Sequence, residues 1–154
     1  FYQPTPVRVI LRLIDELKPS ADDVFYDLGS GIGHVPILFN LLTGIRVKGV
    51  ELEESYIRFS EACLQKLGLS GATFVQADAR AADYSDGTIF YMYTPFRGEL
   101  MEQVLTTLEA QSKQRPIRVC AYGPCTLQVS KAKWLRSITQ TGKRETHYGL
   151  FSSI

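Results

Sequence analysis

The 154 residues are enough for one domain with one hydrophobic core, since a chain of this length buries roughly two-thirds of its unfolded surface on folding. The 17 basic and 16 acidic residues give a formal net charge of +1. This balance excludes a global electrostatic field that recruits nucleic acid or an anionic membrane, so any contact with a polyanion has to be local.

The cysteines and histidines do not form a metal-binding or disulfide pattern. Cys63, Cys120 and Cys125 are odd in number and lack a C-x-x-C pair, and the histidines are His34 and His147. A structural zinc site or a disulfide framework is therefore not expected. The pattern favours three reduced thiols in a cytoplasmic protein without a bound metal.

The chain opens with a predicted amphipathic helix. Thr5 is interpreted as its N-cap, Pro6 as its first residue, and Pro19 marks its end. Apolar residues recur at helical spacing at Val7, Ile10, Leu11, Ile14 and Leu17.

A strand and a glycine-rich loop follow the first helix. The run Val24–Leu28 is apolar apart from Asp27, which suits a strand covered on both faces. Glycines then occupy alternate positions 29, 31 and 33, where a backbone can turn tightly against a ligand. A helix over His34–Leu42 begins at the last glycine. Strand, loop and helix together predict the first half of a βαβ unit.

The alternation of strands and helices continues downstream. Strands are predicted at 46–52, 72–77, 88–93 and 117–122, and helices at 53–67, 98–108 and 126–132. Such alternation predicts an α/β fold with a three-layer, doubly wound and mostly parallel sheet. Met92 and Cys120 lie within these predicted strands and are expected to belong to the core.

The C-terminal tail departs from this rhythm. Residues 134–139 and 146–154 are predicted strands joined around Thr141 and Gly142, which brings the sheet to about seven strands with a terminal hairpin. No linker or repeat is found, so residues 1–154 are predicted to form a single domain. Within it, residues 1–18 are expected to cap the site and residues 133–154 to form the hairpin.

Polar residues stand where the apolar strands stop, at Asp27, Glu51, Asp78 and Thr94. In an open parallel sheet, ligands bind outside the carboxyl ends of the strands. We therefore expect these side chains to converge on a ligand.

Two phosphate-binding loops compete for the glycine-rich segment. A nicotinamide-binding loop needs glycine at position 34, which is His34, whereas Gly33 lies one residue early. Asp27 would also repel a pyrophosphate, so a cationic ligand suits it better. A Walker-type loop fails because no Gly-Lys-Ser/Thr follows.

Three segments carry a family resemblance: residues 27–33 (DLGSGIG), 49–52 (GVEL) and 76–79 (QADA). Together they resemble the class I S-adenosylmethionine-dependent methyltransferases. The resemblance implies S-adenosylmethionine as cofactor and a closing antiparallel strand in the sheet.

The resemblance also implies roles for individual residues. Asp27 would meet the methionine ammonium, and Glu51 would accept both ribose hydroxyls. Leu52 would lie on the adenine, and Asp78 with the Ala79 amide would read its edge. The loop residues Gly29, Ser30, Gly31 and Gly33 would approach the methionine and ribose. Two simpler readings stay open: Asp78 as a helix N-cap and His34 as a partly exposed residue at a helix start.

The acceptor side is expected at the end of the fourth strand, in Tyr91-Met92-Tyr93-Thr94-Pro95-Phe96. It resembles the D/N-P-P-Y motif of amino-methylating family members, with Thr94 replacing the acid or amide, which puts nucleobase amine methylation in doubt. The candidate acceptor-positioning residues are Tyr93, Thr94 and Phe96. Alternatively, these aromatic residues are only sheet core.

The acceptor itself is left open by the sequence. A resemblance to seven-strand protein lysine methyltransferases favours a protein amine, and a small molecule is an equal alternative. A non-catalytic protein that senses S-adenosylmethionine or S-adenosylhomocysteine is a second class. An RNA-binding methyltransferase is a third, suggested by basic residues near the C-terminus, although a solvated edge strand explains them more simply. They are Lys131, Lys133, Arg136, Lys143 and Arg144.

Overall fold

The computed structural model describes residues 3–93, 96–139 and 147–154. Its helices are α1 (Val7–Leu17), α2 (His34–Thr43), α3 (Glu54–Leu67), α4 (Gly98–Ser112) and α5 (Thr126–Val129). Its strands are β1 (Val24–Leu28), β2 (Arg46–Glu51), β3 (Ala72–Gln76), β4 (Ile89–Tyr93), β5 (Arg118–Tyr122), β6 (Leu135–Ser137) and β7 (Tyr148–Ser153). The predicted elements are all present, with ends that differ by no more than four residues.

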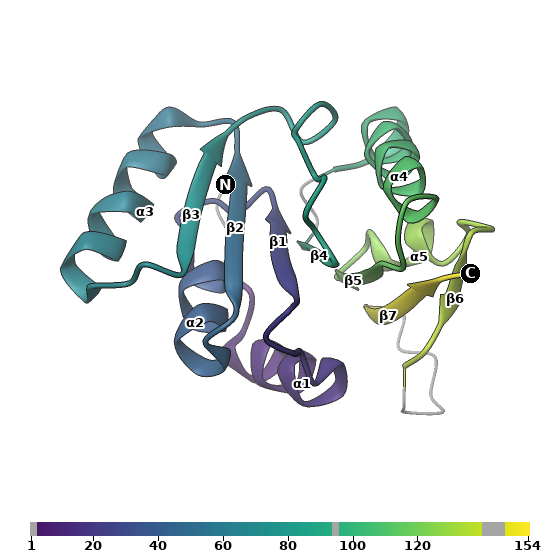
Figure 1. The fold of residues 1–154 in the computed structure, drawn as a ribbon. Coiled ribbons are helices and arrows are strands. Elements are labelled where there is room, and N and C mark those ends of the chain that lie inside the picture. The colour runs from purple at the N-terminus through teal and green to yellow at the C-terminus, as the bar shows by residue number, and fades with distance from the viewer. Residues whose placement is uncertain (1–2, 94–95, 140–146) are drawn as a thin grey trace.

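The strands form one seven-stranded sheet in the order β3-β2-β1-β4-β5-β7-β6 (Figure 1). Strands β1 to β5 are parallel, and β7 runs antiparallel between β5 and β6. The strand order reverses between β1 and β4, where ligands bind in such sheets. The predicted mostly parallel sheet with terminal antiparallel strands is confirmed.

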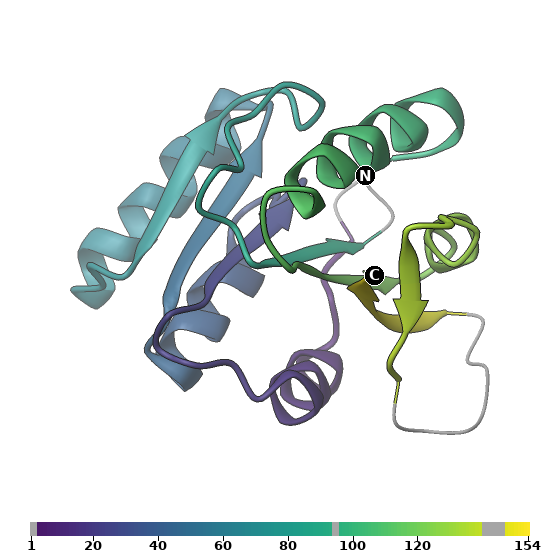
Figure 2. The same ribbon diagram turned by 45° about the vertical axis from the view of Figure 1, so that its right-hand side comes forward.

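Two hydrophobic cores cover the two faces of the sheet. One packs α1, α2 and α3 against residues such as Phe25 and Tyr91, and the other packs α4 and α5 against residues such as Tyr26 and Phe90. Figures 1 and 2 show the two groups of helices on opposite faces. Because β1 contributes alternate side chains to both cores, all five of its residues are buried.

Helix α1 differs from its prediction in its start and in its buried face. Pro6 is the N-cap, and the Thr5 side chain bonds to Tyr91 instead of capping the helix. Val7 is 53% and Leu11 50% exposed. The buried stripe is Val9, Ile10, Leu13 and Leu17. The sequence offers two adjacent apolar stripes, and packing against the sheet selects one of them.

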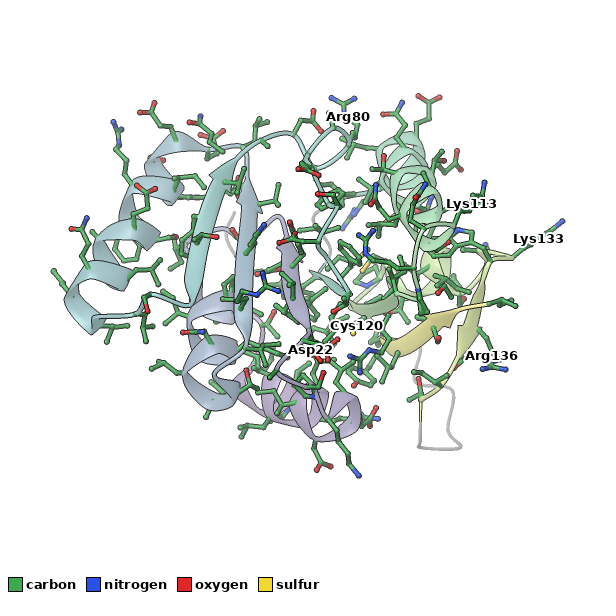
Figure 3. The ribbon with its side chains drawn as sticks, in the orientation of Figure 1. Asp22, Arg80, Lys113, Cys120, Lys133 and Arg136 are labelled. Carbon is green, nitrogen blue, oxygen red and sulfur yellow. The ribbon has the colours of Figure 1, made fainter. Side chains whose placement is uncertain are left out.

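The C-terminal edge carries the basic residues. Lys131, Lys133 and Arg136 are exposed, and Figure 3 shows Lys133 and Arg136 projecting away from the molecule. This placement agrees with a solvated edge strand. Lys143 and Arg144, together with the predicted turn at 141–142, lie outside the described residues.

Over the described ranges, no helix combines the length and apolar character needed to cross a bilayer. Met92 and Cys120 are fully buried, as predicted.

Two glycines that flank α2 give a test of how the loop is built. Gly33 and Gly44 both have left-handed backbones, with φ of 80° and 72°. A Cβ on Gly33 would lie 2.4 Å from the Phe74 ring and 2.6 Å from the Ser60 hydroxyl, whereas a Cβ on Gly44 meets nothing within 4 Å. The two alanine variants therefore share backbone strain and differ in steric overlap.

We expect Gly44→Ala to lower the free energy of unfolding by about 1 kcal/mol, from the left-handed backbone alone. Gly33→Ala should cost roughly 2–4 kcal/mol, because overpacking adds to that strain. Chemical denaturation measures both. Equal losses in the two variants would contradict the tight packing of Gly33 against Phe74.

Candidate functional site

A cleft of about 360 Å³ opens at the carboxyl ends of β1, β2 and β4. Its volume falls in the range of small-molecule sites. The lining residues come from the N-terminal segment, the glycine-rich loop, the ends of β1, β2 and β4, and the starts of α2, α3 and α4. They are Gln3, Thr5, Asp27, Gly29, Ser30, Gly31, His34, Val35, Glu51, Tyr56, Tyr91, Tyr93 and Arg97.

The glycine-rich loop is folded across the end of β2. The N–H groups of Gly29 and Ser30 donate to the Val50 carbonyl at 2.8 and 3.0 Å. Gly29 and Gly31 have φ values of 78° and 54°, which side-chain-bearing residues rarely adopt. The loop backbone thus forms one wall of the cleft.

Glu51 is held by the backbone around it. Its Oε2 accepts a hydrogen bond from Gly31 N–H at 2.8 Å, and its Oε1 accepts from Leu52 and Glu53 N–H at 2.7 and 3.0 Å. Three N–H donors stabilise the carboxylate and fix its direction. A hydrogen-bond acceptor is therefore presented to the cleft in one orientation.

Asp27 is an acid buried at the floor of the cleft, with 4% of its surface exposed. Burial, and then the negative charge of Glu51, raise the pKa of Asp27 to about 8. The carboxyl group is therefore mostly protonated at neutral pH. A cation bound beside it would favour its ionised form.

Ser30 adds an unsatisfied polar group to the same wall. Its hydroxyl is buried and has no hydrogen-bond partner among the described residues. Buried polar groups are rarely left without a partner, so this hydroxyl indicates that a ligand or an ordered water binds there.

The N-terminal segment completes the cleft in a way that the sequence did not indicate. Thr5 Oγ1 and the Tyr91 hydroxyl lie 2.8 Å apart, and His34 Nε2 donates to the Thr5 carbonyl at 3.1 Å. Gln3 and Thr5 line the cleft, but no residue of α1 is among its lining residues. The contribution expected from residues 1–18 thus comes from the segment before the helix.

The predicted adenine-reading residues lie beside the cleft and do not line it. Asp78 makes an ion pair with Arg80, whose Nε is 3.0 Å from both carboxylate oxygens. Hydrogen bonds from the Arg80 side chain hold the pKa of Asp78 at about 2. Arg80, which sequence reasoning missed, projects from the upper edge in Figure 3. Asp78 is therefore held by a salt bridge next to the cleft.

The other two residues of that group differ in exposure. Leu52 is 63% exposed, at the end of β2, where an apolar surface could receive a flat ring. Ala79 is 6% exposed, and its carbonyl accepts a hydrogen bond from the Tyr84 hydroxyl at 2.7 Å. Of the predicted cofactor residues, Asp27, Gly29, Ser30, Gly31 and Glu51 line the cleft, whereas Gly33, Leu52, Asp78 and Ala79 do not.

Of the candidate acceptor-positioning residues that the structure describes, one lines the cleft and one does not. Tyr93 lines the cleft, and its ring lies 4.8 Å from that of Tyr122, centroid to centroid. Phe96 instead packs against the hydrophobic core to which α4 and α5 contribute, and does not line the cleft. Thr94 lies outside the described residues. Arg97 lines the cleft and carried no signal in the sequence.

Burial, and then the neighbouring Tyr122, raise the pKa of the Tyr93 phenol. Tyr93 therefore remains protonated at neutral pH and can donate a hydrogen bond or pack, but it is a poor general base. The described residues contain no cluster of three or more potential metal ligands.

Comparison with known proteins relates the chain to lysine methyltransferases. The family model of the histone methylation protein DOT1 matches residues 2–75. A protein-lysine N-methyltransferase of Saccharolobus islandicus is 35% identical over 97 residues, which cover 60% of this chain and 58% of that protein. A histone-lysine N-methyltransferase of Dictyostelium discoideum, specific for lysine 79 of histone H3, is 30% identical over 126 residues, covering 72% of this chain and 7% of that protein.

Solved structures share the whole fold. An RNA methyltransferase of Salinibacter ruber in complex with S-adenosyl-L-homocysteine aligns with a TM-score of 0.72 at 21% identity, over 98% of this chain and 92% of that one. A methyltransferase of Aquifex aeolicus aligns with a TM-score of 0.71 at 15% identity, over 97% and 94%. The chain has the fold of the class I S-adenosylmethionine-dependent methyltransferases. It spans 58% and 7% of the lengths of the two lysine methyltransferases it matches.

The buried acid of the cleft predicts a pH-dependent stability. Asp27 binds its proton more tightly in the folded chain than in the unfolded chain, where its pKa is about 4. Its contribution to the free energy of unfolding therefore declines as pH rises from about 4 to about 8.

We expect Asp27→Asn to remove this decline and to be more stable than the parent protein by roughly 2 kcal/mol at pH 8, since no buried charge has to form. Asp22→Asn, at an exposed position, is the matched control and should stay within about 0.5 kcal/mol of the parent. Thermal and denaturant unfolding between pH 5 and pH 9 measure the difference. An Asn variant that is less stable than the parent at pH 8 would refute the buried-acid interpretation.

Proposed function

We propose that this chain binds S-adenosylmethionine and transfers its methyl group to the side-chain amine of a lysine in a protein. The observation that carries the proposal is the pair of acids in the cleft, the buried Asp27 and the backbone-fixed Glu51, beside a glycine-rich loop. The similarity to two lysine methyltransferases supports the acceptor class.

The residues of the cleft fit this cofactor. Asp27 is a buried acid that a cation would ionise, which suits the methionine ammonium. Glu51 presents an oriented carboxylate, which suits the two ribose hydroxyls. The Ser30 hydroxyl lacks a partner, and the positive φ angles of the glycines leave room for close approach of a ligand. An acidic site of this kind is unsuited to a dinucleotide pyrophosphate.

The cofactor supplies a methyl group activated on a positively charged sulfur, so the protein has to orient the acceptor and exclude water. Tyr91 and Tyr93 provide aromatic walls at the end of β4. Both are expected to remain protonated, because burial raises the pKa of each phenol. A lysine amine must lose its proton before it attacks, and neither phenol can take it at neutral pH. The rate of transfer should therefore rise with pH.

Cofactor binding gives the first test. S-adenosylhomocysteine should raise the melting temperature, because a ligand at 100 times its dissociation constant adds about 2.7 kcal/mol to the free energy of unfolding. NAD should have no effect. Glu51→Ala should abolish the shift, whereas Glu61→Ala, at an exposed position on α3, should leave it unchanged. A shift with NAD alone would overturn the cofactor assignment.

Turnover gives the second test. The protein is incubated with methyl-labelled S-adenosylmethionine and a cell extract, which is then separated into protein, nucleic-acid and small-molecule fractions. We expect label in the protein fraction, recovered as methyl-lysine after hydrolysis and lost when the lysines of the extract are chemically blocked beforehand. Label confined to RNA or to small molecules would disprove the lysine assignment, and label in no fraction would favour a cofactor sensor.

A further inference from the structure

Three acids stand at the ends of three adjacent strands with a regular offset. Asp27 on β1 is the register partner of Gly49 on β2, and Glu51 lies two residues beyond Gly49. Glu51 is in turn the register partner of Gln76 on β3, and Asp78 lies two residues beyond Gln76. Each acid is therefore one strand further across the sheet and two residues further along its strand direction than the acid before it.

The base of the proposed cofactor extends toward the end of β3. In the proposed function, Asp27 receives the methionine ammonium and Glu51 receives the ribose, and β3 lies on the side of β2 away from β1. Neighbouring strands are about 4.8 Å apart, so β3 is about 10 Å from β1 across the sheet. The chain beyond β3 stays joined to β2, since Ala77 N–H donates to the Glu51 carbonyl at 3.0 Å. Asp78 therefore stands on the side of the ribose where the base is expected.

Arg80 holds both oxygens of the Asp78 carboxylate. Its Nε lies 3.0 Å from Oδ1 and 3.0 Å from Oδ2, its Nη2 donates to Oδ2, and its backbone N–H donates to Oδ1 at 2.9 Å. A carboxylate accepts about four hydrogen bonds, so these three donor groups fix its direction and leave room for one further donor. The hydrogen bonds from the Arg80 side chain keep the pKa of Asp78 at about 2, so the group is an acceptor at neutral pH.

Arg80 is itself held by α4. Its Nη1 donates to the side-chain oxygen of Gln103 at 3.2 Å, and the Thr107 hydroxyl donates to the Arg80 carbonyl at 2.9 Å. The ion pair is nevertheless open to water, with 45% of the Arg80 side chain and 35% of the Asp78 side chain exposed. Exposed ion pairs contribute little to stability, because water and salt screen them. The many contacts of this exposed guanidinium therefore favour the orientation of Asp78 over the stabilisation of the fold.

We propose that Arg80 is a positioning residue that directs the Asp78 carboxylate to the exocyclic amine of adenine in the bound cofactor. This inference rests on the proposed function and adds to it a residue that determines which base is selected. The amine donates the hydrogen bond that the oriented carboxylate can still accept, whereas a purine without the amine leaves that position unpaired. Arg80 makes no contact with the ligand in this arrangement and acts through Asp78.

Two ligands that differ only at the base isolate this role. They are S-adenosylhomocysteine and its 6-deamino analogue, in which hydrogen replaces the exocyclic amine. The variants are Arg80→Met, which removes the guanidinium, Arg80→Lys, which lacks the planar fork, and Asp78→Ala, alone and combined with Arg80→Met. Arg58→Met is the matched control, because Arg58 also pairs with an acid, Glu54, at an exposed position on α3.

By isothermal titration, the parent protein should bind S-adenosylhomocysteine about tenfold more tightly than the deamino analogue, which corresponds to one hydrogen bond to a charged group. Arg80→Met should weaken binding of S-adenosylhomocysteine about fivefold and binding of the analogue less than about twofold, so that the preference for the amine falls. Arg80→Lys should lie between the parent and Arg80→Met, and Arg58→Met should match the parent for both ligands. The double variant should bind no more weakly than Asp78→Ala alone, because the arginine acts through the acid.

Equal weakening of both ligands by Arg80→Met, or no change in either, would rule out the inference and leave the proposed function intact. A double variant that binds S-adenosylhomocysteine more weakly than Asp78→Ala would also rule it out, because Arg80 would then act on the ligand without Asp78. A parent protein that binds neither ligand would disprove the proposed function together with this inference.

Discussion

The glycine-rich loop and the end of β2 are tied together by the Glu51 carboxylate. Its two oxygens accept three backbone N–H groups, one from Gly31 and two from the residues that follow β2. Because Glu51 accepts from donors in two separate turns, moving the loop away from the strand end would break the hydrogen bond between Gly31 N–H and Oε2. The remaining features of the cleft are positioned relative to this contact.

Asp27, on the neighbouring strand β1, differs from Glu51 in its hydrogen bonds. Glu51 accepts hydrogen bonds from three backbone N–H groups, whereas Asp27 is buried without a described donor, and burial and the charge of Glu51 raise the pKa of Asp27. The two acids at adjacent strand ends are therefore held in different ways. This difference makes Asp27 the group that responds to a bound cation, and Glu51 the group that holds a fixed acceptor.

Much of this arrangement could be predicted from the sequence. The apolar runs that end in Asp27 and Glu51 define neighbouring strands, and the glycine spacing defines the loop, because both are local patterns. The contact between Thr5 and Tyr91 could not be predicted, since it joins side chains 86 residues apart and Thr5 also fits a helix cap. The prediction of the buried face of α1 was wrong at Val7 and Leu11, because that helix carries two adjacent apolar stripes. Arg80 was missed because nothing local distinguishes an arginine that binds a nearby acid from one that faces water.

The contact of Thr5 with Tyr91 also has a consequence for how the protein matures during synthesis. The walls of the cleft come from positions as far apart as Gln3 and Arg97, and the strand that anchors the N-terminal segment is the fourth of the sheet. Contacts of such sequence separation form late, since the intervening chain must be ordered before its ends can meet. A nascent chain that has formed β1, α2 and β2 already contains the glycine-rich loop and Glu51 but not the opposite wall. Stabilisation by a ligand that contacts both walls is therefore available only after β4 has left the ribosome and joined the sheet.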